Sequence, residues 1–288
     1  MRNKFLVFGV TIFMAGMVFC GTTQAKSAGS IQIKGSDTMV NLTQAWSEEF
    51  MKKHPESFVA VTGGGSGTGF SALIGGTCDI AASSRSITEK EMELAAKKGI
   101  APKEFKVALD GLAVVVNPKN PVSQLTLDQL AGIFSGKITN WKEVDGQDVK
   151  IVVLSREVNS GTHVYFKEHV LRKGDSKSKE EFSPEALMLS SSQAIADEVK
   201  QNIATIGYYG MGYIGKDHKA ISVAKDGSTD FVYPKLEDVV SEHYPISRPL
   251  FLYTPGEPAG EVKDFIDFAL STEGQSVVSQ VDFVPIKK

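Results

Sequence analysis

Short apolar runs alternate with amphipathic stretches along most of the chain. The runs are typical of buried strands, whereas the stretches place apolar residues at spacings of three and four, which is typical of helices. We therefore predict an α/β fold. The expected strands are 31–34, 58–62, 79–82, 107–117, 150–154, 205–209, 221–224 and 249–253.

Several expected helices have visible ends. A capping box, in which Ser or Thr is followed three residues later by Glu or Gln, marks a helix start, and glycine often marks a helix end. Two segments show both features: Thr88 with Glu91 and then Gly99, and Thr126 with Gln129 and then Gly136.

Some side chains that could carry chemistry are expected to belong to the core. Met39, Leu42, Trp46 and Phe50 form one helical stripe, so packing is favoured over ligand stacking for the two aromatic residues. Cys78 is interpreted as a small buried hydrophobe rather than a nucleophile.

The extreme N-terminus predicts a signal peptide. Arg2 and Lys4 precede an apolar run from Phe5 to Cys20, and small or polar residues lead to a cleavage site after Ala25. Residues 1–25 would thus be removed and the protein secreted. A lipid anchor on Cys20 is a weaker alternative, because a bulky phenylalanine precedes that cysteine.

Composition and charge narrow the function. Hydrophobic residues at 42% and charged residues at 23% are ordinary for a globular protein. The formal net charge is −3, and loss of Arg2 and Lys4 with the signal peptide makes it −5. This balance argues against a nucleic-acid binder that depends on a general basic surface.

A chain of this length is expected to form two α/β lobes. Pro118 and Pro121 lie near one candidate crossover between lobes, and Pro245 and Pro249 lie near another. Two crossovers imply that the second lobe is inserted in the first. The expected division is lobe I at 26–112 and 247–288, and lobe II at 113–246.

Four expected strand-to-helix junctions combine small residues, glycines and hydroxyls. Glycine allows close approach of the backbone to a ligand, a helix N-terminus offers unpaired N–H groups, and hydroxyls add donors. Loops at the carboxyl ends of strands in open α/β sheets bind ligands, so the four together would suit an anion. They are Gly35-Ser36-Asp37-Thr38, Gly63–Gly69, Ala82–Ser86 and Ser155–Thr162.

Each junction has a simpler explanation, since a lone hydroxyl before a helix is usually an N-cap. Arg85 and Arg156 strengthen the anion hypothesis, because a guanidinium can donate to two oxygens of a tetrahedral anion, although each could be structural. His163 could contact the anion or act as a base near Ser160, but a histidine on a helix surface is the favoured interpretation.

The sequence lacks the motifs of nucleotide binding, of serine hydrolases and of metal binding on helices. The Gly63–Gly69 loop lacks the Lys and Ser/Thr of a nucleotide P-loop, and Thr68 breaks the nucleophile-elbow pattern around Ser66. The five histidines show no spacing of helical metal ligands. We therefore expect neither a metal nor a cofactor.

With these junctions in view, the chain resembles the phosphate-binding proteins that serve as the substrate-binding component of high-affinity phosphate ABC transporters. The resemblance runs from about Ile31 to the C-terminus. The stretch Ile133–Trp141 and the spacing from Arg156 to Ser160-Gly161-Thr162 are its most specific parts. It also rests on Gly35–Thr38, Gly63–Gly69, Asp79–Arg85, Leu125–Trp141 and Pro245–Ser247.

The resemblance implies a two-lobed type II periplasmic-binding-protein fold, with two inter-lobe crossover strands, that closes on one phosphate. It implies no enzymatic activity, a monomeric chain and a membrane permease as partner. The ligand-binding residues carried over from the family, together with the junction residues beside them, are Ser36, Asp37, Thr38, Ser66, Ser84, Arg85, Arg156, Ser160, Gly161 and Thr162.

Two positions depart from the best-known branch of that family. Ser84, followed by Arg85, stands where a carboxylate is usual, and Val158 stands where an acid usually braces the arginine, which leaves Glu157 as a substitute. We hypothesise that Asp37 instead accepts the proton that distinguishes phosphate from sulfate; the alternative is that it only caps its own helix.

Other functions remain open at this point. A different tetrahedral anion, sulfate or molybdate, is the main alternative ligand. A secreted phosphatase with Ser66 or Ser160 as nucleophile is disfavoured, since no base with an orienting partner is evident. For an extracellular adhesive or signalling module, the secretion signal is the sole support.

Overall fold

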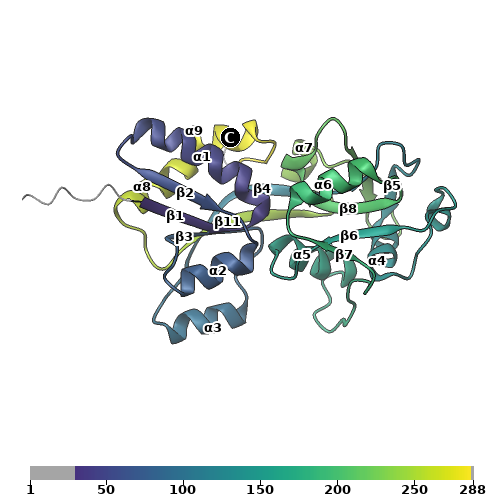
Figure 1. The fold of residues 1–288 in the computed structure, drawn as a ribbon, viewed down its shortest axis with the longest axis horizontal. Coiled ribbons are helices and arrows are strands. Elements are labelled where there is room, and N and C mark those ends of the chain that lie inside the picture. Colours follow the sequence, from purple (N-terminus) through teal and green to yellow (C-terminus); the bar gives the residue numbers. More distant parts are fainter. Residues whose placement is uncertain (1–29, 287–288) are drawn as a thin grey trace, which may run out of the picture.

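The computed structural model describes residues 30–286, so the expected signal peptide, its cleavage site and Cys20 lie outside the described residues. Within this range one mixed sheet of nine strands runs through the molecule in the order β2-β1-β3-β11-β4-β8-β6-β7, with β9 paired to β4 (Figure 1). The strands of this sheet are β1 Ser30–Gly35, β2 Phe58–Thr62, β3 Ile80–Ser83, β4 Lys103–Val116, β6 Val152–Arg156, β7 Leu187–Leu189, β8 Thr205–Gly210, β9 Lys219–Ala220 and β11 Ser247–Thr254.

All eight expected strands are present, with ends shifted by a few residues. A separate pair, β5 (Gln124–Thr126) and β10 (Ser222–Ala224), forms a small parallel sheet. Three short strands, β5, β7 and β9, were not predicted, because two or three residues are too few to show a period.

Helices cover both faces of the sheet (Figure 1). The stripe Met39, Leu42, Trp46 and Phe50 is fully buried, which confirms its predicted core role. Cys78 is buried too, and burial raises its pKa to about 11, as expected of a packed thiol. The α-helices are α1 Val40–Lys53, α2 Ser66–Ile74, α3 Glu89–Lys97, α4 Leu127–Ser135, α5 Gly161–Phe166, α6 Ser192–Gln201, α7 Leu236–Val240, α8 Gly260–Leu270 and α9 Thr272–Gln280.

Four short helical segments connect these elements: η1 Asp37–Met39, η2 Trp141–Val144, η3 Lys167–Leu171 and η4 Met211–Tyr213. Both predicted capping boxes are confirmed, at the starts of α3 and α4. Gly136 ends α4 in the left-handed conformation, φ 80°, which favours glycine.

Strand β4 changes its partner halfway. From Lys103 to Gly111 it pairs with β11, and from Leu112 onward it pairs with β8. The chain enters β11 next to this point, where Leu112 N donates to Ile246 O at 2.8 Å. Two extensive hydrophobic clusters accordingly form around the two parts of the sheet, one with Trp46 and the other with Trp141.

None of the helices between residues 30 and 286 is both long enough and apolar enough to cross a membrane.

Candidate functional site

The four junctions of the sequence analysis meet at the carboxyl ends of β1, β2, β3 and β6. Gly65 N donates to Gly35 O at 2.8 Å, which joins the first two junctions. Gly67 N donates to Asn159 O at 3.0 Å, which joins the second to the fourth. The side chain of Asn159, which the sequence analysis did not single out, also donates to Gly64 O at 2.7 Å.

Four hydroxyls gather where these junctions meet. Thr38 Oγ1 lies 2.7 Å from Thr162 Oγ1, and Ser66 Oγ lies 3.4 Å from Ser84 Oγ. Ser84 N also donates to Ser66 Oγ at 3.1 Å. All four residues are at most 1% exposed. We call Thr38, Ser66, Ser84 and Thr162 the hydroxyl cluster; each hydroxyl can donate to an anion or accept from a protonated one.

Gly161 allows the fourth junction to approach this closely. A Cβ atom at this position would lie 2.3 Å from Ser66 Oγ and 2.7 Å from Ser84 Oγ, so any side chain would displace the hydroxyls. Ser160 next to it caps α5, since its Oγ accepts from the N–H groups of Thr162 and His163. Ser36 is buried at the start of η1, and its side chain makes no cap.

Arg248 on β11 is the cation that contacts the hydroxyl cluster. Its Nη2 lies 3.1 Å from Thr162 Oγ1 and 3.5 Å from Thr38 Oγ1, and its Nη1 donates to Ser84 O at 3.2 Å. The Arg248 side chain is completely buried. A buried guanidinium next to hydroxyl donors is suited to hold a small anion.

A buried carboxylate fixes Arg248. Asp110 Oδ2 accepts from Arg248 Nη2 at 2.8 Å and Nε at 3.0 Å, and Asp110 Oδ1 accepts from Met211 N at 3.0 Å. Burial raises the pKa of Asp110, and the charge and hydrogen bonds of Arg248 oppose that shift. Asp110 and Arg248 lie opposite each other in the β4–β11 pair, the strands that link the two clusters.

Sequence reasoning missed both residues. A period-two argument could have found them, because Asp110 stands within the expected strand 107–117 and Arg248 directly precedes the expected strand 249–253. Charged residues at such positions are rarely buried unless they are paired, so they would have indicated each other.

Arg156 is buried as well, but its partners are different. Its Nε donates to Leu189 O, its Nη2 to Ser190 O and its Nη1 to Ser192 Oγ, at 3.3, 3.0 and 2.9 Å. Asp37 Oδ2 lies 3.2 Å from Nη2. Burial lowers the pKa of Arg156, and the charge of Asp37 opposes this.

Two expectations about acids are corrected here. Glu157 does not brace Arg156; it is exposed, and Asp37 from the first junction takes that place. Nor does Asp37 cap its own helix, because its Oδ2 accepts from Ser192 N, at the start of α6, at 2.7 Å. Tyr213 also binds this residue, since its hydroxyl donates to the backbone oxygen of Asp37 at 2.9 Å.

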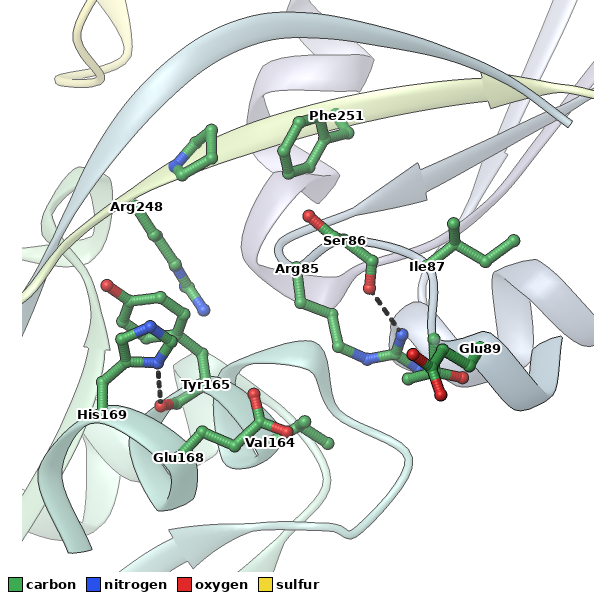
Figure 2. Close-up of a pocket in the computed structure, with 12 residues that line it drawn as sticks. Arg85, Ser86, Ile87, Glu89, Val164, Tyr165, Glu168, His169, Arg248 and Phe251 are labelled. Atoms are coloured by element: carbon green, nitrogen blue, oxygen red, sulfur yellow. Dashed lines mark hydrogen bonds between the residues drawn. The ribbon is translucent and has the colours of Figure 1, made fainter. Parts of the chain in front are cut away.

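Arg85 lies beside the hydroxyl cluster but is bound elsewhere. Its guanidinium donates to both carboxylate oxygens of Glu91, at 2.7 and 2.8 Å, and to Ser86 O at 2.9 Å. Its Cζ also lies 5.1 Å from the centre of the Phe70 ring. Arg85 also lines a cavity, together with Arg248 (Figure 2).

His163 is not a surface histidine, contrary to expectation. It is 3% exposed, its ring lies against Phe182, and its Nδ1 is 3.3 Å from Ser155 Oγ. Burial lowers its pKa to about 4, so the ring is neutral at pH 7. Within residues 30–286, no group of three or more potential metal-binding His, Cys, Asp or Glu side chains comes together.

The chain is similar to known proteins in sequence and in structure. Residues 21–273 match the family model of the PBP superfamily domain. The phosphate-binding protein PstS of Bacillus subtilis is 33% identical over 267 residues, which are 91% of this chain and 83% of that protein.

Two solved structures are also similar. One is a phosphate ABC transporter substrate-binding protein with bound phosphate from Clostridium perfringens, with 34% identity and a TM-score of 0.80 over 90% of this chain and 100% of that chain. The other is an ABC-type phosphate transport receptor from Vibrio cholerae, with 33% identity and a TM-score of 0.70 over 89% and 100%. The chain therefore belongs to the PstS family of phosphate-binding proteins.

Proposed function

We propose that the chain binds inorganic phosphate at the hydroxyl cluster and delivers it to the permease of a phosphate ABC transporter. The observation that carries this proposal is the buried contact of Arg248 with Thr38 and Thr162. The names of the relatives support the ligand and the transporter. No catalytic step is part of the proposed function.

The fold divides, in this proposal, into the two lobes expected from the sequence, 26–112 with 247–288 and 113–246. The change of partner of β4 at Leu112 and the two hydrophobic clusters support that division. The crossovers would be β4 and the entry to β11. Val284 does not fit this division: its residue number assigns it to lobe I, but it packs in the hydrophobic cluster of lobe II.

Phosphate would lie between the lobes, because the hydroxyl cluster takes Thr38, Ser66 and Ser84 from one lobe and Thr162 from the other. Each hydroxyl can turn its hydrogen toward a phosphate oxygen, and Arg248 supplies positive charge. Hydrogen bonds that involve charged groups contribute about 1.5–3 kcal/mol each. The sum of several such bonds exceeds the binding free energy of a micromolar complex, roughly 8 kcal/mol, even after the cost of ordering is subtracted.

The remaining predicted residues would act around this centre. Ser36, Ser160 and Gly161 shape the junctions, and Asp37 holds Arg156 across the two lobes. Arg156 would reach phosphate only by exchanging some of its present partners. Arg85 would not donate to phosphate in this arrangement, because its guanidinium is paired with Glu91.

The proposed location is the periplasm, reached through the signal peptide at residues 1–25, with cleavage after Ala25 and a monomeric mature protein. Lipid attachment at Cys20 is the alternative. Mass spectrometry of the protein purified from its native host decides between them, because cleavage after Ala25 leaves Lys26 as the first residue.

Calorimetry tests the ligand. We expect one phosphate per chain with micromolar or tighter affinity, and sulfate or molybdate should not displace it at equal concentration. No heat and no thermal shift at millimolar phosphate would end the proposal, whereas preferred sulfate binding would reassign the ligand.

A matched pair of variants tests the position of the site. Thr38→Val with Thr162→Val removes two hydroxyls at nearly constant shape and should weaken phosphate binding at least a hundredfold, about 2.7 kcal/mol. Thr205→Val removes another buried threonine hydroxyl, one that donates to Asn202 O, and should leave affinity unchanged. Equal phosphate affinities in the double variant and in Thr205→Val would show that phosphate does not bind at the hydroxyl cluster.

A phosphatase is not supported by the geometry. The base nearest Ser160 in sequence is His163, and its Nδ1 contacts Ser155 rather than Ser66 or Ser160. Ser160 Oγ accepts two backbone N–H groups, so its lone pairs are engaged in capping. The low pKa of His163, about 4, also makes it a weak base.

A further inference from the structure

A cavity of about 500 Å³ (Figure 2) is lined by Arg248, which contacts the hydroxyl cluster. Its walls come from the loop before α3, from α5 and the start of η3, and from β11. Figure 2 shows Arg248 and Arg85 on opposite sides of it, with Val164 and Glu168 between them. The proposed phosphate site does not use this space.

Arg248 separates the cavity from the hydroxyl cluster. It lines the cavity, while its Nη2 contacts the two threonine hydroxyls of the cluster. Its Cζ lies 5.6 Å from the ring centre of Tyr165, another wall residue. Asp110 holds the guanidinium through Nε and Nη2, so it cannot swing aside without breaking a completely buried ion pair.

We propose that Arg248 determines ligand class: it closes the site to organic phosphates, and the cavity behind it would take the substituent of a phosphate monoester or phosphonate once Arg248 is shortened. This rests on the proposed function. The hydroxyl-cluster residues are at most 1% exposed, so a substituent needs space behind one of the groups around phosphate. Behind Arg248 there is such a space.

The cavity has the chemistry for an aromatic ester. Tyr165, Pro249 and Phe251 offer apolar and aromatic surface. Arg85 also lines the cavity, and its positive charge favours an ester or ring oxygen there. Arg85, which the sequence analysis assigned to phosphate, would thus contact the substituent.

The test is calorimetry of the mature chain with phosphate, methylphosphonate and phenyl phosphate. Wild type should bind phosphate at least a hundredfold more tightly than either of the others. Arg248→Lys keeps a charge beside Asp110 but loses the planar wall. It should lose about tenfold in phosphate affinity and narrow the gap to methylphosphonate by a similar factor.

A double variant, Asp110→Asn with Arg248→Ala, removes the wall without leaving a buried charge unpaired. Phenyl phosphate should then bind at least as tightly as phosphate. Val164→Ala is the control, because it enlarges the same cavity and leaves Arg248 in place; it should keep the wild-type ratios.

Several outcomes overturn the inference. Wild-type binding of phenyl phosphate within tenfold of phosphate would show that Arg248 is no barrier, as would unchanged ratios in Arg248→Lys and the double variant. Equal gains in Val164→Ala would assign the effect to volume alone. A folded double variant that binds neither ligand also overturns it. Failure of the wild type to bind phosphate would instead refute the proposed function.

Discussion

Two buried arginines, Arg156 and Arg248, belong to the proposed phosphate site but lie in different surroundings. Arg156 is the last residue of β6 and begins a recognisable motif, and its guanidinium is bound by backbone carbonyls, Ser192 and Asp37. Arg248 lies within β11, outside any local motif, and reaches the hydroxyl cluster while paired with Asp110. The arginine that sequence brings to attention is therefore not the one nearest the hydroxyls.

This difference follows from how each aspartate reaches its arginine. Asp110 is opposite Arg248 in the hydrogen-bonded register of β4 and β11, so the pair persists in any state that keeps these strands paired. Asp37 and Arg156, by contrast, lie on parts of the chain that belong to different lobes in the proposed division. If the lobes move apart, the Asp37–Arg156 pair would separate and the Asp110–Arg248 pair would not.

The largest expected effect comes from Arg248→Met. It leaves the charge of Asp110 buried without a partner, which should cost about 3–5 kcal/mol in the free energy of unfolding. Denaturant titration measures this. Arg85→Met is the comparison, because its partner Glu91 is partly exposed; it should cost about 1 kcal/mol. Equal losses would contradict the contrast between the two ion pairs.

Arg156→Lys should follow in size. A lysine cannot reach two carbonyls, Ser192 and Asp37 together, so phosphate affinity should fall by about 1–3 kcal/mol despite the retained charge. Calorimetry checks this, with unfolding measured in parallel. Wild-type affinity would make Arg156 a purely structural residue and leave Arg248 as the sole cation of the site.

The third prediction concerns pH at the Arg156 junction. Burial lowers the pKa of His163 from 6.5 to about 4, so the unfolded chain takes up this proton more readily. The stability from neutral His163 is thus fully present above pH 6.5 and is lost as pH falls toward 4, by about 2 kcal/mol at pH 5. His163→Gln should lack this part of the acid dependence. An identical pH profile in both proteins would refute the assignment.

Asp37→Asn should have the smallest effect. Asparagine can still accept from Ser192 N but removes the charge beside Arg156, so phosphate affinity should drop by about 1 kcal/mol. If Asp37 acts only through Arg156, the preference for phosphate over sulfate stays the same. A gain of sulfate binding would show that Asp37 accepts the phosphate proton.

Local patterns predicted much of the fold. The α1 stripe, the two capping boxes and the eight expected strands depend on neighbours within a few residues, which a sequence displays directly. Strands such as β7 depend on a partner far along the chain, here β6, and show no local period. The sequence therefore predicted elements better than it predicted short edge pairings.

The residues of the candidate site also differ in how far the sequence predicts them. Hydroxyls and glycines in the junctions were visible because strand ends in α/β sheets gather ligand loops. Arg248 and Asp110 are 138 residues apart, and Asp37 and Asn159 act through contacts of similar sequence separation. The roles of these residues depend on which strands become neighbours, which no short motif reports.

Each arginine around the hydroxyl cluster has its own carboxylate, Asp110, Asp37 or Glu91. The site consequently carries little net charge, and it lies in a protein that is itself acidic. Long-range attraction then contributes little to the rate at which the anion arrives, and short, buried hydrogen bonds decide how long it stays. Capture by such a site should vary little with ionic strength.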